Sequence, residues 1–239
     1  SIMAGRGVAQ VIESDCSDLP VGAVVQARLG WQEYALIDMS HHPAPFFLPT
    51  DLPLSHGIGA VSLSGITALV GIRDIGNVKP EDRILVSGAA GGVGSHVAAI
   101  AKALGAGDVV GVAGGAEKCR RLRSEMAYDH VIDYKNEDVD RALSIAFPEG
   151  IDLYFDNVGG TLLDNVLGRL RRRARIVICG AISEYLVDTA DKHHFVNLQN
   201  LGRQDAKMEG FFVFDYEAQY PECIETLAGW IRAGQLNPI

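Results

Sequence analysis

The sequence has few cysteines. Only four of its 239 residues are cysteine, and none of them forms a Cys-x-x-Cys pair or stands beside a histidine at metal-ligand spacing. A disulfide framework and a zinc ribbon both need clustered cysteines, so this spacing argues against either. We expect four free thiols.

Positive charge and long apolar runs are also scarce. Lys and Arg number 21 against 30 Asp and Glu, which gives a net charge of −9, whereas a nucleic-acid surface needs an excess of basic side chains. No apolar run reaches the length of a bilayer span, and the first residues lack a basic segment followed by an apolar one. We expect a soluble, cytoplasmic protein that binds neither nucleic acid nor membrane.

The chain does have enough apolar residues for a folded core. Hydrophobic residues make up 48% of it and charged residues 21%, with no long polar tract. This composition is typical of a globular protein, and the length allows one large domain or two small ones.

A glycine-rich turn is the most informative stretch of the chain. The apolar run 84–86 leads into residues 87–95 (SGAAGGVGS), after which apolar residues recur at helical spacing. A strand, a tight turn and a helix leave backbone N–H groups free at a helix N-terminus, where a pyrophosphate can bind. The spacing Ala89-x-Gly91-x-x-Gly94 is a variant of the dinucleotide fingerprint. A tight turn without a ligand is the alternative.

Strands and helices alternate after this turn. Such alternation predicts an α/β fold with a doubly wound parallel sheet. The predicted strands are 83–87, 108–113, 130–133, 152–156, 175–179 and 210–214, and the predicted helices are 92–104, 116–126, 137–146, 160–170 and 221–233.

The part before the turn is different. Short β-like pieces cover residues 7–13, 21–25 and 34–37, and they contain too little apolar sequence to close a barrel. Four prolines between residues 43 and 53 predict a connector without regular structure, and residues 57–73 suit one or two closely packed helices.

The end of the second cofactor-domain strand indicates which dinucleotide binds. An NAD site needs an Asp or Glu there for the ribose hydroxyls, but the chain has Gly114 and Gly115. Lys118 follows in the first turn of the next helix, where it can reach a 2′-phosphate. This favours NADPH. The alternative is that Lys118 and the nearby arginines form a solvated helix face.

Other charged residues are interpreted as structural. The arginines of 169–175 close a helix and precede a strand, which predicts a solvated turn. His96 is expected to be packed. His193 and His194 are expected to be surface histidines rather than metal ligands, because no carboxylate or cysteine stands at metal-ligand spacing from them.

Five motifs occur in an order that resembles one family. They are residues 30–34 (GWQEY), 87–95, 155–160 (FDNVGG), 179–185 (CGAISEY) and 208–211 (MEGF). The set is similar to the zinc-independent medium-chain dehydrogenases/reductases of the prostaglandin reductase (leukotriene B4 12-hydroxydehydrogenase) and curcumin reductase type. The resemblance implies NADPH-dependent reduction of the carbon–carbon double bond of α,β-unsaturated ketones and aldehydes.

The resemblance also implies the site residues. The phosphate turn is Gly91, Gly92, Val93 and Gly94, the 2′-phosphate is held by Lys118 and Tyr134, and Asn157 lies along the cofactor. Two further segments surround the nicotinamide: Cys179, Gly180, Ala181, Ile182, Ser183 and Tyr185, and then Phe211, Phe212 and Val213.

The family resemblance implies two domains as well. Residues 1–55 correspond to part of a GroES-like, β-rich catalytic domain with its connector, 56–234 to a Rossmann dinucleotide-binding domain, and 235–239 to the return to the catalytic domain. Family chains start before Ser1 and continue beyond Ile239, so we expect the catalytic domain here to be incomplete. Leu69 stands where family members have tyrosine.

No metal is predicted. Zinc-dependent relatives carry a cysteine-rich lobe, and the corresponding interval here, residues 25–31, is short and has no cysteine. Without a Lewis acid, a hydrogen-bond donor must stabilise the developing enolate oxygen, and we assign that role to Tyr185. A packing role for Tyr185, and water as the proton donor, remain the alternatives.

Two other functions are compatible with the sequence: an NADPH quinone oxidoreductase of the same superfamily, and a non-catalytic NADPH-binding module. The family resemblance also predicts a homodimer that forms through the sheet edge at 210–214.

Overall fold

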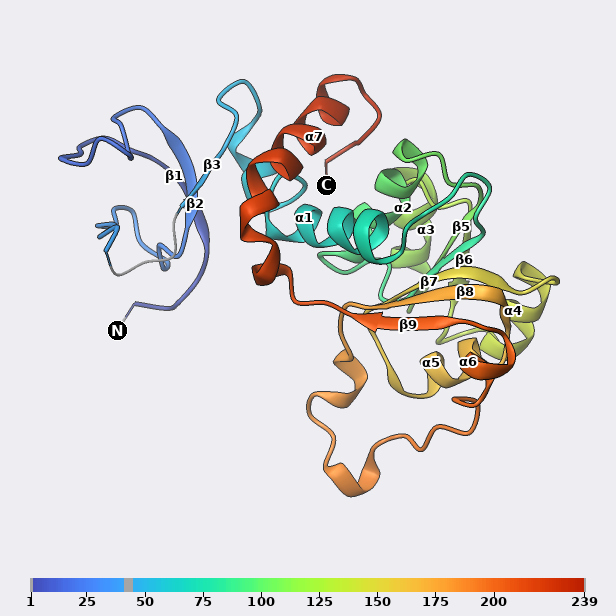
Figure 1. The fold of residues 1–239 in the computed structure, drawn as a ribbon. Coiled ribbons are helices and arrows are strands. Elements are labelled where there is room, and N and C mark those ends of the chain that lie inside the picture. The colour runs from blue at the N-terminus through green and yellow to red at the C-terminus, as the bar shows by residue number, and fades with distance from the viewer. Residues whose placement is uncertain (1, 41–44, 239) are drawn as a thin grey trace.

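The computed structural model describes residues 2–40 and 45–238. It contains two sheets, a three-stranded sheet near the N-terminus and a six-stranded sheet surrounded by helices (Figure 1). No helix in the described ranges is both long and apolar enough to cross a membrane.

The six-stranded sheet is entirely parallel, with the order β6-β5-β4-β7-β8-β9. Its strands are β4 (Ile84–Val86), β5 (Val109–Ala113), β6 (His130–Asp133), β7 (Ile151–Asp156), β8 (Leu170–Ile178) and β9 (Lys207–Gly210). From β4 the chain adds β5 and β6 on one side and then β7, β8 and β9 on the other side. The direction of winding therefore reverses at β4. Ligands bind at that point in open α/β sheets.

Helices cover both faces of this sheet (Figure 1). One apolar cluster packs α1, α2, α3 and α7 against the first face, and another packs α4 and α5 against the second. The helices are α1 (Leu63–Val70), α2 (Gly94–Ala103), α3 (Ala116–Glu125), α4 (Val139–Ala146), α5 (Gly160–Leu167), α6 (Asn200–Arg203) and α7 (Tyr220–Arg232). The predicted doubly wound α/β fold is confirmed.

Two predicted strands are wrong in their bounds. β8 begins at Leu170 rather than 175, and it contains a bulge in which Arg173 adopts a left-handed φ of 63°. β9 ends at Gly210, where the prediction had a strand begin, because four exposed residues pair with β8 ahead of the aromatic run. Val213 starts a 3₁₀ helix, η5 (Val213–Gln219), instead of ending a strand.

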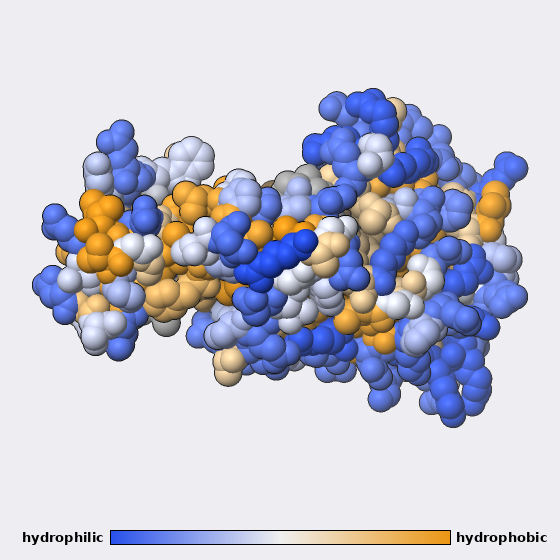
Figure 2. All heavy atoms as spheres, turned by 90° about the horizontal axis from the view of Figure 1, so that it is seen from above, coloured by the Kyte–Doolittle hydropathy of each residue, from blue (hydrophilic) through white to orange (hydrophobic). Residues whose placement is uncertain are grey.

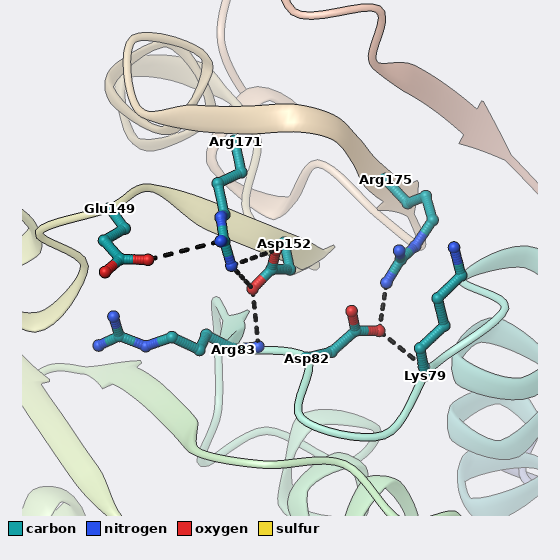
Figure 3. A network of polar contacts seen from close by, with 7 residues as sticks. All are labelled: Lys79, Asp82, Arg83, Glu149, Asp152, Arg171 and Arg175. Atoms are coloured by element: carbon teal, nitrogen blue, oxygen red, sulfur yellow. Dashed lines mark hydrogen bonds and ion pairs between the residues drawn. The ribbon is translucent and has the colours of Figure 1, made fainter.

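Four of the five arginines of 169–175 therefore lie in strand β8 and not in a turn, and Arg169 directly precedes the strand. Arg171 pairs with Asp152 and Glu149, and Arg175 pairs with Asp82, which also accepts a hydrogen bond from the backbone N–H of Lys79 (Figure 3). These carboxylates hold the arginines at the amino end of β4, β7 and β8. The arginines are thus at the opposite end of the sheet from the glycine-rich turn.

The N-terminal sheet is antiparallel and small. β1 (Gly7–Gln10) pairs with β2 (Val24–Ala27), which pairs with β3 (Phe46–Phe47) inside the proline-rich segment that was predicted to be irregular. Residues 34–37, predicted as a strand, form none, and Tyr34 and Leu36 are 75% and 93% exposed. Figure 2 shows apolar side chains gathered on the surface of this lobe, at the left of the view.

Polar and aromatic contacts join the N-terminal part of the chain to the helices beside the six-stranded sheet. The Gln26 side chain donates to the carbonyl of Gly57 in the 3₁₀ helix η1 (Leu54–Ile58) at 2.8 Å. The guanidinium of Arg232 on α7 pairs with both carboxylate oxygens of Asp51, at 2.8 and 2.9 Å. The Arg6 guanidinium lies 5.3 Å from the centre of the Phe46 ring and 5.7 Å from that of Phe214.

The predicted helical segment 57–73 contains α1, which continues as a π-helical turn, η2 (Gly71–Ile75).

Candidate functional site

The glycine-rich turn connects β4 to α2. Gly88 makes the reversal with a φ of 57°, a conformation that glycine adopts without strain. Gly94 must be glycine for a different reason, since a Cβ there would lie 2.3 Å from the carbonyl oxygen of Gly88. The helix therefore starts directly against the turn, and the first position of the fingerprint, Ala89, is buried behind it.

The turn presents backbone donors. Among the described residues, the N–H groups of Gly92 and Val93 have no acceptor. Both groups stand at the N-terminus of α2, where the helix dipole adds partial positive charge. A cavity of about 230 Å³ lies beside them, lined in part by Gly91, Gly92 and Ser64. These features suit the diphosphate of a dinucleotide.

Lys118 and Tyr134 lie at the carboxyl ends of the neighbouring strands β5 and β6. The Tyr134 ring packs on Gly114, where a Cβ would lie 2.7 Å from ring atoms, and its backbone N–H donates to Ala113. Lys118 is exposed in the first turn of α3. Because Gly114 has no side chain, the Tyr134 ring packs directly on its backbone. The glycine that stands where an NAD site has an acidic residue therefore also makes room for Tyr134.

Asp133 holds this corner in shape. Its carboxylate accepts hydrogen bonds from the backbone N–H groups of Gly115 and Lys135 and from the Asn136 side chain. The hydrogen bond from Gly115 is the main reason why the pKa of Asp133 lies below its ordinary value.

Asn157 follows β7 and is held by Ser87. Its backbone N–H donates to the Ser87 hydroxyl at 2.8 Å, and its side-chain amide donates to the Ser87 carbonyl at 2.7 Å. The Ser87 hydroxyl in turn donates to Asp156 Oδ1 at 2.7 Å. The end of β4 and the end of β7 are therefore locked together, with the Asn157 amide in a fixed orientation.

Asp156 is the residue that the sequence analysis missed. It has no exposed surface, and its carboxyl group accepts hydrogen bonds from the hydroxyls of Ser87 and Tyr154 and from the backbone N–H groups of Val158 and Gly159. Its carbonyl accepts from the N–H groups of Cys179 and Gly180. An acidic residue at the end of an otherwise apolar strand, directly before asparagine, was the available signal.

The segment from Cys179 to Tyr185 runs beside this centre. The N–H of Ile182 donates to the Asn157 carbonyl, and both the N–H and the hydroxyl of Ser183 donate to the Val158 carbonyl. Burial, aided by Asp156, raises the pKa of the Cys179 thiol to about 12. The structure thus brings Asn157 and the 179–185 segment together at the carboxyl end of the sheet.

Tyr185 folds back on the same segment. Its hydroxyl oxygen accepts a hydrogen bond from the N–H of Ala181 at 3.1 Å, and its side chain is 65% exposed. In residues 2–40 and 45–238 this hydroxyl has no acceptor of its own, so its hydrogen is available to an incoming carbonyl oxygen.

The surroundings of Phe211, Phe212 and Val213 differ. Gly210 pairs with Ile178, so Phe211 and Phe212 directly follow the strand end next to Cys179. Phe212 is 63% exposed, whereas Phe211 packs near Gly71 and Tyr216. Val213 is buried, and its carbonyl accepts from the Tyr220 hydroxyl. Leu69 is fully buried in the core and lines no cavity wall that we identify in the described chain.

The loop after Tyr185 is fastened to α5. Asp164 accepts hydrogen bonds from His193 Nε2 at 2.9 Å and from the N–H groups of Val196 and Asn197. The fold thus gives His193 a carboxylate partner 29 residues away in the sequence, which no local spacing indicates. Burial raises the pKa of Asp164, but the hydrogen bonds from His193 and the backbone outweigh it, so the net pKa is lowered.

Metal ligands do not gather in the part of the chain that the structure covers. No group of three or more His, Cys, Asp and Glu side chains there could hold a metal ion. All four cysteines are free thiols, as expected.

Comparisons with known proteins bear on this geometry. The family described as zinc-binding dehydrogenase matches residues 92–229. The NADP(+)-dependent 2-alkenal reductase of Nicotiana tabacum is 39% identical over 237 residues, which cover 99% of this chain and 68% of the relative. Prostaglandin reductase 1 of Rattus norvegicus is 37% identical over 238 residues, 98% of this chain and 71% of the relative. The crystal structure of CurA from Vibrio vulnificus in complex with NADPH matches with a TM-score of 0.85 and 34% identity, over 98% of this chain and 70% of that chain.

Proposed function

We propose, from the premise that this chain belongs to the zinc-binding dehydrogenase family and is one of its NADP-dependent oxidoreductases, that it reduces the carbon–carbon double bond of α,β-unsaturated ketones and aldehydes. The observation that carries the proposal is the site itself. Free N–H donors at the glycine-rich turn and the basic side chain of Lys118, in the first turn of α3, lie at the same edge of the sheet.

The residues present fit NADPH. Free N–H groups at Gly92 and Val93, and Gly114 and Gly115 in place of an acidic residue, favour a phosphorylated dinucleotide. When bound, the cofactor supplies the hydride that adds to the β-carbon of the substrate.

We assign four groups of residues to the cofactor. Gly91, Gly92, Val93 and Gly94 bind the diphosphate, and Lys118 and Tyr134 bind the 2′-phosphate. Asn157 orients the nicotinamide end, supported by its two hydrogen bonds to Ser87. The segments 179–183 and 211–213 border the same end and exclude water from it, although Val213 contributes through packing because it is buried.

Tyr185 is proposed as the hydrogen-bond donor to the substrate carbonyl. Its hydroxyl is exposed and oriented by the N–H of Ala181, so it can stabilise negative charge that develops on the enolate oxygen. A reaction without metal is proposed as well, and the scattered donor side chains of the described residues support it.

Substrate turnover tests the function. NADPH oxidation is followed with a simple alkenal, with an enone and with a quinone. We expect turnover of the first two and a lower kcat/KM for the quinone. If NADPH binds but neither unsaturated carbonyl is reduced, the protein is a binding module and the proposed activity is wrong.

Lys118→Ala tests the cofactor assignment. Loss of a charge-assisted hydrogen bond to the 2′-phosphate is expected to weaken NADPH binding by about 1–3 kcal/mol, with NADH binding nearly unchanged. The measurement is a fluorescence titration with each dinucleotide. Equal losses for both would show that Lys118 does not contact the 2′-phosphate.

We also propose a cytoplasmic location, a homodimer, and a boundary near residue 55 between the catalytic and the dinucleotide-binding domain. The change from an antiparallel to a parallel sheet supports the boundary, and the strand β9 at the edge of the sheet supports the dimer.

A further inference from the structure

Arg6 directly precedes strand β1, where the N-terminal sheet meets the segment that follows β9. Its guanidinium lies over two aromatic rings, 5.3 Å from the centre of Phe46 and 5.7 Å from that of Phe214 in η5. The carboxyl end of β9 points toward the three-stranded sheet, so η5 reaches that sheet directly (Figure 1). Aromatic faces attract cations, and these two rings fix the position of the guanidinium.

The guanidinium has no countercharge. In residues 2–40 and 45–238 it makes neither a hydrogen bond nor an ion pair, although an arginine side chain carries five N–H donors. By contrast, Arg175 and Arg232 each pair with a carboxylate. Arg6 is half-buried, and a partly desolvated cation without a partner destabilises the folded protein. Its position therefore needs a reason other than stability.

The Arg6 guanidinium is open to a ligand. Within the described chain, buried side-chain nitrogens and oxygens without a partner occur only on Gln26, His56, His96 and Arg175. Each unpartnered nitrogen of Arg6 therefore keeps exposed surface. The two rings hold the side chain in place without neutralising its charge.

The electrostatic surroundings of Arg6 favour an anion. Burial and the positive charge of Arg28 lower the pKa of Arg6 from its ordinary value, because both disfavour the charged form. Tyr220 and Glu217 act in the opposite direction and are outweighed. Glu217 forms no ion pair with Arg6 in the part of the chain that the structure covers. A bound anion would supply the missing countercharge.

Phe214 connects Arg6 to the nicotinamide end of the proposed site. The rings of Phe212 and Phe214 lie 5.0 Å apart. Phe212 is 63% exposed and follows the end of β9, which pairs with the end of β8 next to Cys179. Along this series of ring contacts, Arg6 is the charged side chain that a substrate meets beyond Phe212 and Phe214.

We propose that Arg6 is a specificity-determining residue that binds a carboxylate of the substrate, an α,β-unsaturated ketone or aldehyde whose double bond lies at the nicotinamide end. The two oxygens of a carboxylate match two parallel N–H groups of a guanidinium. A doubly charged phosphate would lose more hydration at a half-buried position between aromatic rings. The proposal rests on the proposed function and adds a substrate class to it.

Matched substrates and three variants test this assignment. The substrates are propenyl ketones that end in a carboxyl group, with three, five or seven methylene groups between ketone and carboxyl, and their uncharged methyl esters. Arg6→Gln removes the charge, and Arg6→Lys keeps it without the bidentate geometry. Arg203→Gln is the matched control, because Arg203 is exposed on α6 and donates to the neighbouring Asn200. NADPH oxidation gives kcat and KM for each pair.

For at least one spacer we expect the unmodified protein to reduce the acid with a kcat/KM about ten- to a hundredfold above that of its ester, as for a hydrogen bond between charged groups. Most of this difference should lie in KM, because the carboxylate is bound equally in the ground state and the transition state. Arg6→Gln should bring the ratio of acid to ester close to one. Arg6→Lys should keep part of the ratio, and Arg203→Gln all of it.

Equal kcat/KM for acid and ester at every spacer in the unmodified protein would overturn the assignment of Arg6, and so would a preference for the acid that Arg6→Gln retains. The ratio compares two substrates in one variant, so a partial loss of folded protein does not change it. Ester turnover without a preference for the acid overturns only this assignment. If the unmodified protein reduces neither acids nor esters, the proposed function itself is wrong.

Discussion

Asp156 shows how one residue can organise the site without touching a ligand. Its buried carboxyl group joins the ends of β4 and β7 through Ser87, and its carbonyl binds the start of the 179–185 segment. Its position between three segments of the site makes it a positioning residue for Asn157.

Asp156→Asn is expected to destabilise the protein by about 3 kcal/mol, because the new amide group would face hydroxyl and N–H donors that have lost an acceptor. Urea unfolding measures the change. Asp205→Asn is the control, because Asp205 is an exposed carboxylate that pairs with the exposed arginines Arg172 and Arg173 on β8. An equal effect of the two substitutions would contradict this role.

Cys179 gives a prediction that depends on pH. Because burial raises its thiol pKa to about 12, the reactive thiolate is a fraction of about one in ten thousand at pH 8 and grows only as the pH approaches 12. Iodoacetamide at pH 8 should therefore modify the half-exposed Cys16 well before Cys179. Mass spectrometry of the peptides follows both sites, and protein unfolded in urea provides the reference in which both react.

At the scale of elements, the β4-turn-α2 unit is defined by close packing between its own backbone segments. Gly94→Ala should destabilise the protein by about 1–3 kcal/mol and reduce NADPH binding, because the new Cβ would overlap the Gly88 carbonyl and push α2 from the turn.

Gly92→Ala is the matched control for this unit. A Cβ at Gly92 meets only the Ser64 hydroxyl, at an ordinary 3.5 Å, and the residue has no left-handed φ. We expect its Tm to stay near that of the unmodified protein, whereas its NADPH affinity should fall because the new Cβ would stand in the cavity assigned to the diphosphate. A similar loss of Tm in both variants would contradict the packing role of Gly94.

At the scale of the whole molecule, β9 forms one edge of the six-stranded sheet and leaves Met208 partly exposed. If β9 of one protomer lies beside β9 of its partner across a two-fold axis, a substitution on β9 is present on both sides of the interface. Met208→Glu should then convert a dimer to a monomer, as measured by light scattering after size-exclusion chromatography.

Ile145→Glu is the control for this prediction, since Ile145 is an exposed apolar residue on α4 rather than on the edge strand. It should leave the mass unchanged. A monomer in the unmodified protein, or a Met208→Glu variant that stays dimeric, would contradict association through β9.

The sequence alone determined the features that depend on local order. The alternation of apolar runs with helical periodicity predicted the parallel sheet, and the glycine spacing predicted the turn, because both patterns act over neighbouring residues. Local patterns failed where pairing partners are distant. β3 forms inside a proline-rich segment because β2 lies beside it, and β9 ends at Gly210 because its register follows β8.

The tertiary structure decided which side chains share the site. No spacing in the sequence connects Asp156 with Ser87, Asp164 with His193, or Arg6 with Phe214, since each pair lies on separate elements. The Asp156–Ser87 pair arises from the winding of the sheet, which places the carboxyl ends of β4 and β7 side by side. Whether a charged group finds a partner is likewise a property of packing, and for that reason the guanidinium of Arg6, unpaired among the described residues, is visible only in the folded chain.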